Sequence, residues 1–171
     1  MVDISALRTE LSTDPIGIGY ATELAKENPD YSVLAALLND ATGTGASWVA
    51  ATEHQRFEVR KLLIPATRRL ARGVTISNTA IDAQTQNEWT QVLDTVRSGE
   101  TPIAIDADVI SMLGELETAG ILSTAERYAL EHKKVSRAEL LFGTEVTNTD
   151  VGRAIWNDSW DPNLGQTGRA I

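Results

Sequence analysis

A chain reversal near the N-terminus is the strongest constraint that this sequence places on the fold. A segment with helical periodicity, residues 4–11, ends at Asp14 and Pro15. Pro15 fixes one backbone dihedral, and Gly17 and Gly19 allow backbone angles that other residues avoid. We therefore predict a defined structural turn, built on these four residues, that ends the first helix and redirects the chain.

Apolar residues recur at helical spacing along most of the chain, and capping residues mark several helix starts. Asp30 precedes an apolar helical face, and Ser123 with Glu126 has the pattern of a capping box. Pro65 interrupts a helical pattern, where it either kinks the helix or begins a second one. The segments expected to be helical are residues 4–13, 30–39, 48–72, 82–98, 106–120, 137–142 and 148–156, together with a helix that starts at Ser123.

Strand signals are few. Residues 74–76 and 103–105 are short β-like runs that could pair as a small ribbon. The sequence therefore predicts a mainly α fold, a compact bundle of about six to eight short helices with little or no sheet. We expect this helical domain to cover residues 1–155 and an extended C-terminal arm to cover residues 156–171.

The C-terminal arm places two tryptophans among polar and turn-forming residues. Each ring carries about 150–250 Å² of mostly apolar surface, which is unfavourable in water. The rings either fold back on the protein's own helices or bind a neighbouring subunit, and we expect the second. The Asp-Pro step at 161–162 also favours an extended backbone. The interface candidates are Trp156, Trp160, Leu164 and Ile171.

Charge and cysteine content exclude several classes of protein. The 171 residues include 15 Lys and Arg against 24 Asp and Glu, a net charge of −9, so nucleic acid is not expected as the main partner. Arg68, Arg69 and Arg72 form a local basic cluster that we assign to a solvated helix face. The absence of cysteine excludes disulfides and thiolate chemistry and fits a reducing cytoplasm. The longest apolar run, residues 33–38, is far too short to span a membrane.

No catalytic or metal-binding pattern emerges. His54 and His132 each lack a second ligand nearby, and the Gly43–Gly45 segment lacks the lysine of a phosphate-binding loop. Asp106 and Asp108 lie two residues apart, which suits a helix N-terminus better than paired acid–base chemistry. We therefore predict a protein that is not an enzyme and has no catalytic residues, no cofactor and no metal.

Two runs near opposite ends of the chain carry a resemblance. The first is Leu11-Ser12-Thr13-Asp14-Pro15 with Gly19-Tyr20-Ala21, before a helix that ends in Leu37-Leu38-Asn39. The second is residues 136–143, with Val146-Thr147 and Asp150-Val151. Both are similar to segments of a group of small tailed-bacteriophage proteins, and together they cover about a third of the chain. The sequence departs from that group in extra residues between Ala21 and Asp30 and in the tryptophan-bearing arm.

The resemblance implies a structural component of a phage virion. It implies a protein made in the host cytoplasm that acts at the head–tail connection (neck or adaptor) or in the tail. Its expected partners are other virion proteins and copies of itself, in a homo-oligomeric ring or lattice, without a membrane. The alternatives are a helical interaction protein outside the virion, such as an assembly factor or a regulator of a host protein, and a capsid decoration protein.

Overall fold

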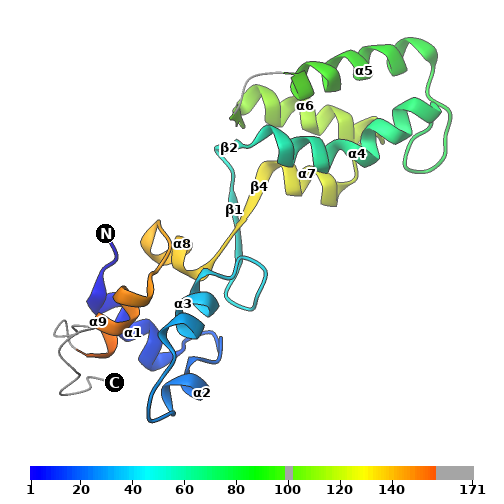
Figure 1. Ribbon diagram of the computed structural model, residues 1–171. Helices are drawn as coiled ribbons and strands as arrows, with labels where there is room; N and C mark the ends of the chain where they lie inside the picture. The colour runs from blue at the N-terminus through cyan, green and yellow to red at the C-terminus, as the bar shows by residue number, and fades with distance from the viewer. Residues whose placement is uncertain (99–101, 157–171) are drawn as a thin grey trace. The chain divides into compact units, whose positions relative to one another are not determined.

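The computed structural model describes residues 1–98 and 102–156 (Figure 1). The prediction of a mainly α fold is confirmed, since the described residues are 59% helical and 9% strand. The described ranges hold nine helices, against the six to eight expected. The chain groups into two compact units: unit 1 contains Met1–Trp48 and the chain from Lys134 onward, and unit 2 contains Val49–Lys133.

Unit 1 is therefore discontinuous in sequence, and unit 2 is inserted into it. The sequence analysis expected one helical domain over residues 1–155, whereas the structure divides these residues between the two units. The chain passes between the units in β1 (Ser47–Ala50) and β4 (His132–Val135), which pair as a two-stranded sheet. Neither of these strands has the Gly- or Pro-rich composition of a linker, so the division into two units could not be recognised from the sequence.

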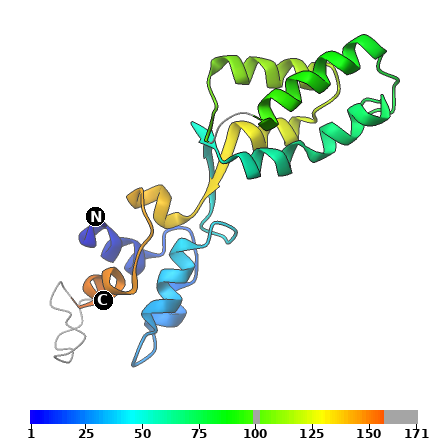
Figure 2. The same cartoon turned by 45° about the horizontal axis from the view of Figure 1, so that its top comes forward.

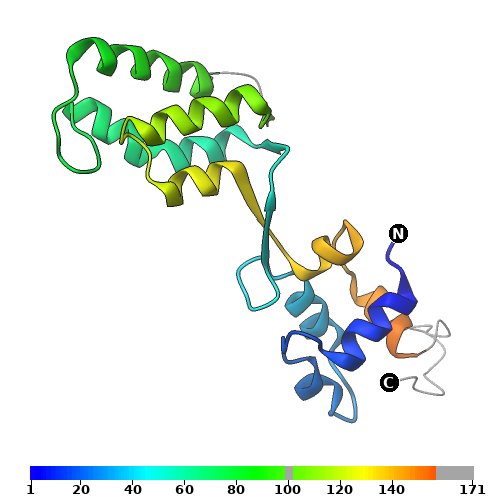
Figure 3. The ribbon, with the colours of Figure 1, turned by 180° about the vertical axis from the view of Figure 1, so that it is seen from behind.

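Five helices lie in the described residues of unit 1. They are α1 (Ile4–Thr13), α2 (Tyr20–Leu24), α3 (Tyr31–Asn39), α8 (Arg137–Phe142) and α9 (Asn148–Ile155). Helix α9 packs on α1 and α3, so the two ends of the described chain lie side by side (Figure 3). The core takes residues from both segments of the chain: Val2, Ile4, Leu7, Leu11, Tyr20, Leu34, Ala35, Leu38, Ala138, Val146, Val151, Ala154 and Ile155.

Unit 2 contains the other helices, shown from teal through green to yellow in Figure 2. They are α4 (Arg56–Arg72), α5 (Ala83–Ser98), α6 (Ala107–Thr118) and α7 (Thr124–Glu131). Helix α4 packs on α5 and α7, and α7 packs on α6. The core is lined mainly by leucine: Val59, Leu63, Ala66, Leu70, Leu93, Leu113, Leu116, Ile121, Leu122 and Leu130.

The strands differ from the sequence prediction. Residues 103–104 form β3, which pairs antiparallel with β2 (Glu53–His54), so the expected ribbon between residues 74–76 and 103–105 is wrong. Val74 instead forms an isolated bridge with Ala80 across its own turn. The segment expected to be helical from residue 48 begins with β1 and β2, and α4 then continues through Pro65 as one helix.

Candidate functional site: a buried network and two exposed surfaces

The predicted N-terminal turn is organised by the side chain of Asp14. Its carboxylate accepts hydrogen bonds from the backbone N–H groups of Ile18, at 2.7 Å, and Gly19, at 2.8 Å. Asp14 itself has a left-handed backbone with φ of 41°, and Gly17 and Gly19 have φ of 69° and 103°. The turn thus combines three positive φ angles with two hydrogen bonds to the Asp14 carboxylate before α2 begins at Tyr20.

Replacing Gly17 or Gly19 with alanine should lower stability by about 1 kcal/mol or more, because an L side chain is strained at these φ angles. A Cβ added at either position meets nothing within 4 Å, so the effect would come from the backbone alone. Denaturant midpoints followed by circular dichroism measure it. Gly114→Ala, inside α6 and without a positive φ, is the control and should keep or raise stability. Unchanged midpoints for both turn variants would show that the glycines are incidental.

Tyr20, which follows the turn, lies beside a buried ion pair between Glu10 and Arg137. Arg137 donates from Nε to Glu10 Oε1 at 2.8 Å and from Nη2 to Oε2 at 2.7 Å. The Glu10 side chain is only 6% exposed and that of Arg137 is 15% exposed. Tyr20 is fully buried, and this burial, with the negative charge of Glu10, raises the pKa of its hydroxyl. The hydrogen bond to Glu10 likewise raises the pKa of the Arg137 guanidinium.

A second polar link joins the two segments of unit 1. The Asn39 side chain donates from Nδ2 to the carbonyl of Val146 at 2.8 Å and accepts from the Val146 N–H at 2.9 Å. The amide of Asn39 thus satisfies both backbone groups of a buried residue. All the polar residues of these links belong to, or directly adjoin, the two runs that carry the resemblance. These runs therefore build the interior of unit 1.

Only one of the four C-terminal interface candidates lies within the described residues. Trp156 is partly buried against the core of unit 1, and its Nε1 donates to the Tyr31 hydroxyl at 2.6 Å. This residue therefore packs on its own unit, where the sequence analysis expected the arm to leave the domain. The other candidates, Trp160, Leu164 and Ile171, lie outside the described residues.

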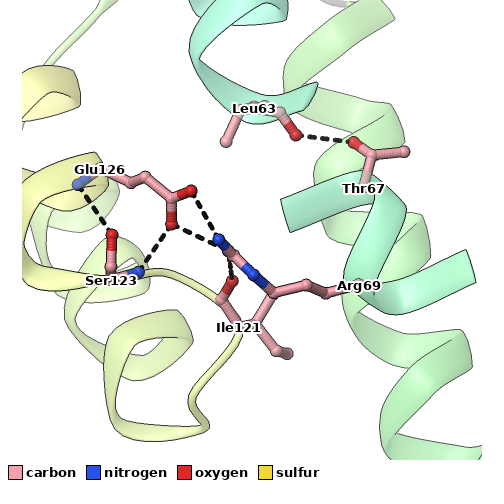
Figure 4. A network of polar contacts seen from close by, with 6 residues as sticks. All are labelled: Leu63, Thr67, Arg69, Ile121, Ser123 and Glu126. Carbon is pink, nitrogen blue, oxygen red and sulfur yellow. Dashed lines mark hydrogen bonds and ion pairs between the residues drawn. The ribbon is translucent and has the colours of Figure 1, made fainter. Parts of the chain in front are cut away.

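A comparable network holds α4 to α7 in unit 2 (Figure 4). Arg69 donates to both carboxylate oxygens of Glu126, at 2.8 and 2.7 Å, and to the carbonyl of Ile121 at 2.6 Å. Glu126 also accepts from the Ser123 N–H at 2.8 Å, which completes the predicted capping box. Burial acts to raise the pKa of Glu126, but the bonds from Arg69 and Ser123 outweigh it and leave this pKa below its usual value.

The first exposed surface is a basic and apolar stripe on α4. This helix carries six of the chain's 15 basic residues and one of its 24 acidic ones. Phe57 is 73% exposed and Ile64 is 45% exposed. At 3.6 residues per turn, Ile64 and the exposed basic residues all fall within about 60° of Phe57 on the helix surface. We call this surface the α4 stripe: Phe57, Arg60, Lys61, Ile64, Arg68 and Arg72.

The sequence analysis placed Arg68, Arg69 and Arg72 together on a solvated face. The structure separates them, because Arg69 enters the network with Glu126 while Arg68 and Arg72 are exposed. A cation in the last turn of a helix is favoured by the helix dipole, which is enough to explain a basic residue at position 72. It does not account for an exposed phenylalanine beside four cations.

The second exposed surface is an acidic and apolar patch on α8. Leu140 and Leu141 are 43% and 42% exposed, although they are adjacent in a short helix. Glu139 before them and Glu145 after them are also exposed. We call these four residues the α8 patch. Leu140 and Leu141 follow Arg137 by three and four residues and share its side of α8, whereas Ala138 is buried in the core of unit 1.

The remaining chemical candidates have local roles. Asp106 caps α6 by accepting from the Val109 N–H at 2.9 Å, as the sequence predicted. His54 is buried, with its Nδ1 3.7 Å from a carboxylate oxygen of Glu58, and His132 stacks on Tyr128 with ring centroids 3.9 Å apart. Over residues 1–98 and 102–156, no group of three or more His, Cys, Asp or Glu side chains could hold a metal ion.

Comparisons with known proteins identify no relative: no protein-family model, curated protein or solved structure matches this chain. Within the described part of the chain, no helix combines the length and apolar character needed to cross a membrane.

Proposed function

We propose that this protein is a non-enzymatic, multi-copy structural component of a tailed-phage virion, at the head–tail connection or in the tail. The observation that carries the proposal is the convergence of the two resembling runs in unit 1. Leu11 and Tyr20 from the first run and Arg137 and Val146 from the second contribute to one interior. Because residues of both runs pack in the same interior, the resemblance supports a similar fold for unit 1. On this basis we propose that the chain has the structural role of that group.

Exposed apolar residues support a role in protein–protein contact. The large hydrophobic residues of the α4 stripe and the α8 patch are between 42% and 73% exposed. Such residues beside charged side chains are typical of surfaces that bind other proteins. The proposed partners are other virion proteins and copies of this chain, in a ring or lattice.

Mass spectrometry of purified particles tests the proposal directly. A virion component should be present at a constant number of copies per particle, and immunogold labelling should locate it at the neck or tail. Presence only in infected-cell lysate would overturn the proposal in favour of an assembly factor or a host-protein regulator. Labelling spread over the head would instead identify a capsid decoration protein.

Truncation after Trp156 tests the proposed role of the C-terminal arm. We expect the shortened chain to remain folded, because Trp156 keeps its hydrogen bond to Tyr31, and to enter particles poorly, because the remaining interface candidates are lost. Circular dichroism measures the first result, and quantitative mass spectrometry of particles measures the second. Truncation after Ile155, which also removes the Trp156 contact, serves as the comparison. A truncated protein that unfolds, or that is incorporated normally, would contradict the arm hypothesis.

A further inference from the structure

The charge and apolar content of the α4 stripe define the partner that it can bind. Lys61, Arg68 and Arg72 call for an acidic surface. Phe57 and Ile64 gain from burial only against apolar groups. These two residues are seven positions apart, so they form a row about 10 Å long on one side of α4. A phosphate backbone would satisfy the cations and leave this row in water, so the stripe fits an acidic protein surface that carries its own apolar residues.

The chain itself contains a surface of that kind. The α8 patch places two exposed leucines between Glu139 and Glu145, which is the complement of an apolar row flanked by Lys and Arg. Outside α4 the chain is more acidic than its net charge of −9 indicates, because α4 holds so many of the basic residues. Two copies of this chain are therefore attracted to each other where α4 of one meets an acidic face of the other.

We infer that the α4 stripe of one copy binds the α8 patch of a second copy. The inference rests on the proposed function as a multi-copy component, and it names the surfaces through which the copies meet. Phe57 and Ile64 pack against Leu140 and Leu141 of the second copy. The cations of the stripe face Glu139 and Glu145 of that copy. Because the stripe and the patch are different surfaces, each copy keeps one of each free for another neighbour. Such contacts propagate head to tail and close into a ring or extend into a filament.

Sedimentation velocity over a concentration series tests the contact with charge-reversed chains. A stripe variant carries Lys61→Glu and Arg68→Glu, and a patch variant carries Glu139→Lys and Glu145→Lys. Wild-type protein should associate, and each variant alone should associate at least about tenfold more weakly, because like charges then face each other. A chain with all four substitutions should regain association, since opposite charges face each other again. A 1:1 mixture of the stripe and patch variants should also regain association, because the acidic stripe of one variant faces the basic patch of the other and the unchanged stripe faces the unchanged patch.

The control for these variants changes charge away from the stripe. Asn87→Asp with Gln91→Glu, both exposed on α5, makes the chain more negative by as much as Arg68→Glu alone and should leave association unchanged. A wild type that stays monomeric throughout the series would overturn the inference. Equal association of the stripe variant and the wild type would overturn it as well, as would failure of the four-substitution chain to recover.

A photo-crosslinking experiment identifies the surfaces in contact without relying on loss of binding. A benzoylphenylalanine replaces Phe57 in unlabelled protein, which is mixed with an excess of ¹⁵N-labelled wild type and irradiated. Mass spectrometry should find crosslinks from position 57 to labelled peptides that contain residues 139–145. Crosslinks only to unlabelled peptides, or to labelled peptides from another surface, would overturn the inference.

Failure of this inference can be told apart from failure of the proposed function. Particle mass spectrometry reports presence in the virion whatever surface is used. The protein could be present at constant copy number in virions while its stripe variant sediments and is incorporated like the wild type. That result would support the proposed function and contradict this interface. Association through the stripe, together with absence from particles, would support the interface and contradict the proposed function.

Discussion

Replacing Arg137 with alanine is expected to reduce the stability of unit 1 by about 3–5 kcal/mol, since one partner of a buried ion pair is removed. The Glu10 side chain, 6% exposed in the folded protein, would lose the two hydrogen bonds that now compensate its charge. Tyr20 cannot take over this role, because its hydroxyl has a single proton to donate and carries no positive charge to balance the carboxylate. Denaturant titration, with amide hydrogen exchange of α1 and α8, measures the loss.

Three further variants make this experiment specific. Arg137→Lys keeps the charge but cannot form the paired contacts of a guanidinium, so it should lie between wild type and Arg137→Ala. The double variant Glu10→Leu with Arg137→Met removes both charges and should recover most of the stability. Arg68→Ala, at an exposed position, is the matched control and should have no measurable effect. A loss for Arg137→Ala no larger than that of the control would mean that the ion pair does not hold α8 to α1.

Replacing Arg69 with alanine is expected to reduce the stability of unit 2 by about 2–3 kcal/mol. The change leaves both the Glu126 carboxylate and the Ile121 carbonyl without the guanidinium that now binds them. Arg72→Ala, three residues further along the same helix and exposed, is the matched control. Hydrogen exchange of α4 and α7 separates this loss from any change in unit 1.

The same network predicts a dependence of stability on pH. The pKa of Glu126 is lower in the folded protein than its ordinary value of 4.5, so the unfolded chain binds this proton more tightly. The carboxylate therefore contributes stability above about pH 4.5, and this contribution is lost as the pH falls through the lower folded pKa. The stability difference between wild type and Glu126→Gln should accordingly shrink below pH 4.5. A difference that stays constant down to pH 3 would show that the charge of Glu126 is not responsible.

Local features of the fold were predictable from sequence because they depend on neighbouring residues. Ser123, Asp30 and Asp106 each cap a helix through an amide two or three residues away, and such spacing can be recognised in a single sequence. The turn at Asp14 follows from the conformational freedom of glycine and the fixed dihedral of proline. These features determine where helices begin and end.

The long-range features were not predictable in this way. Glu10 and Arg137 are 127 positions apart and Asn39 and Val146 are 107 apart, so no local pattern links them. The pairing of β2 with β3 was missed because two-residue strands carry almost no propensity signal. The α4 stripe was missed for a different reason. A basic cluster looks solvated until the structure shows which of its residues are buried, and the sequence alone did not show that Phe57 is exposed.

The insertion of unit 2 between the halves of unit 1 has a consequence for the order of folding during synthesis. All of unit 2 leaves the ribosome before the residues from Lys134 onward. Until those residues follow, α1 and α3 lack α9, the helix that packs on both. Joining the halves of unit 1 across an unfolded insert of this length would cost on the order of 4 kcal/mol in chain entropy. A folded unit 2 removes most of this cost, because the Ala51 N–H donates to the Glu131 carbonyl at 2.9 Å and brings the ends of the insert together. Folding of unit 2 thus brings the two segments of unit 1 close together and favours their packing into one core.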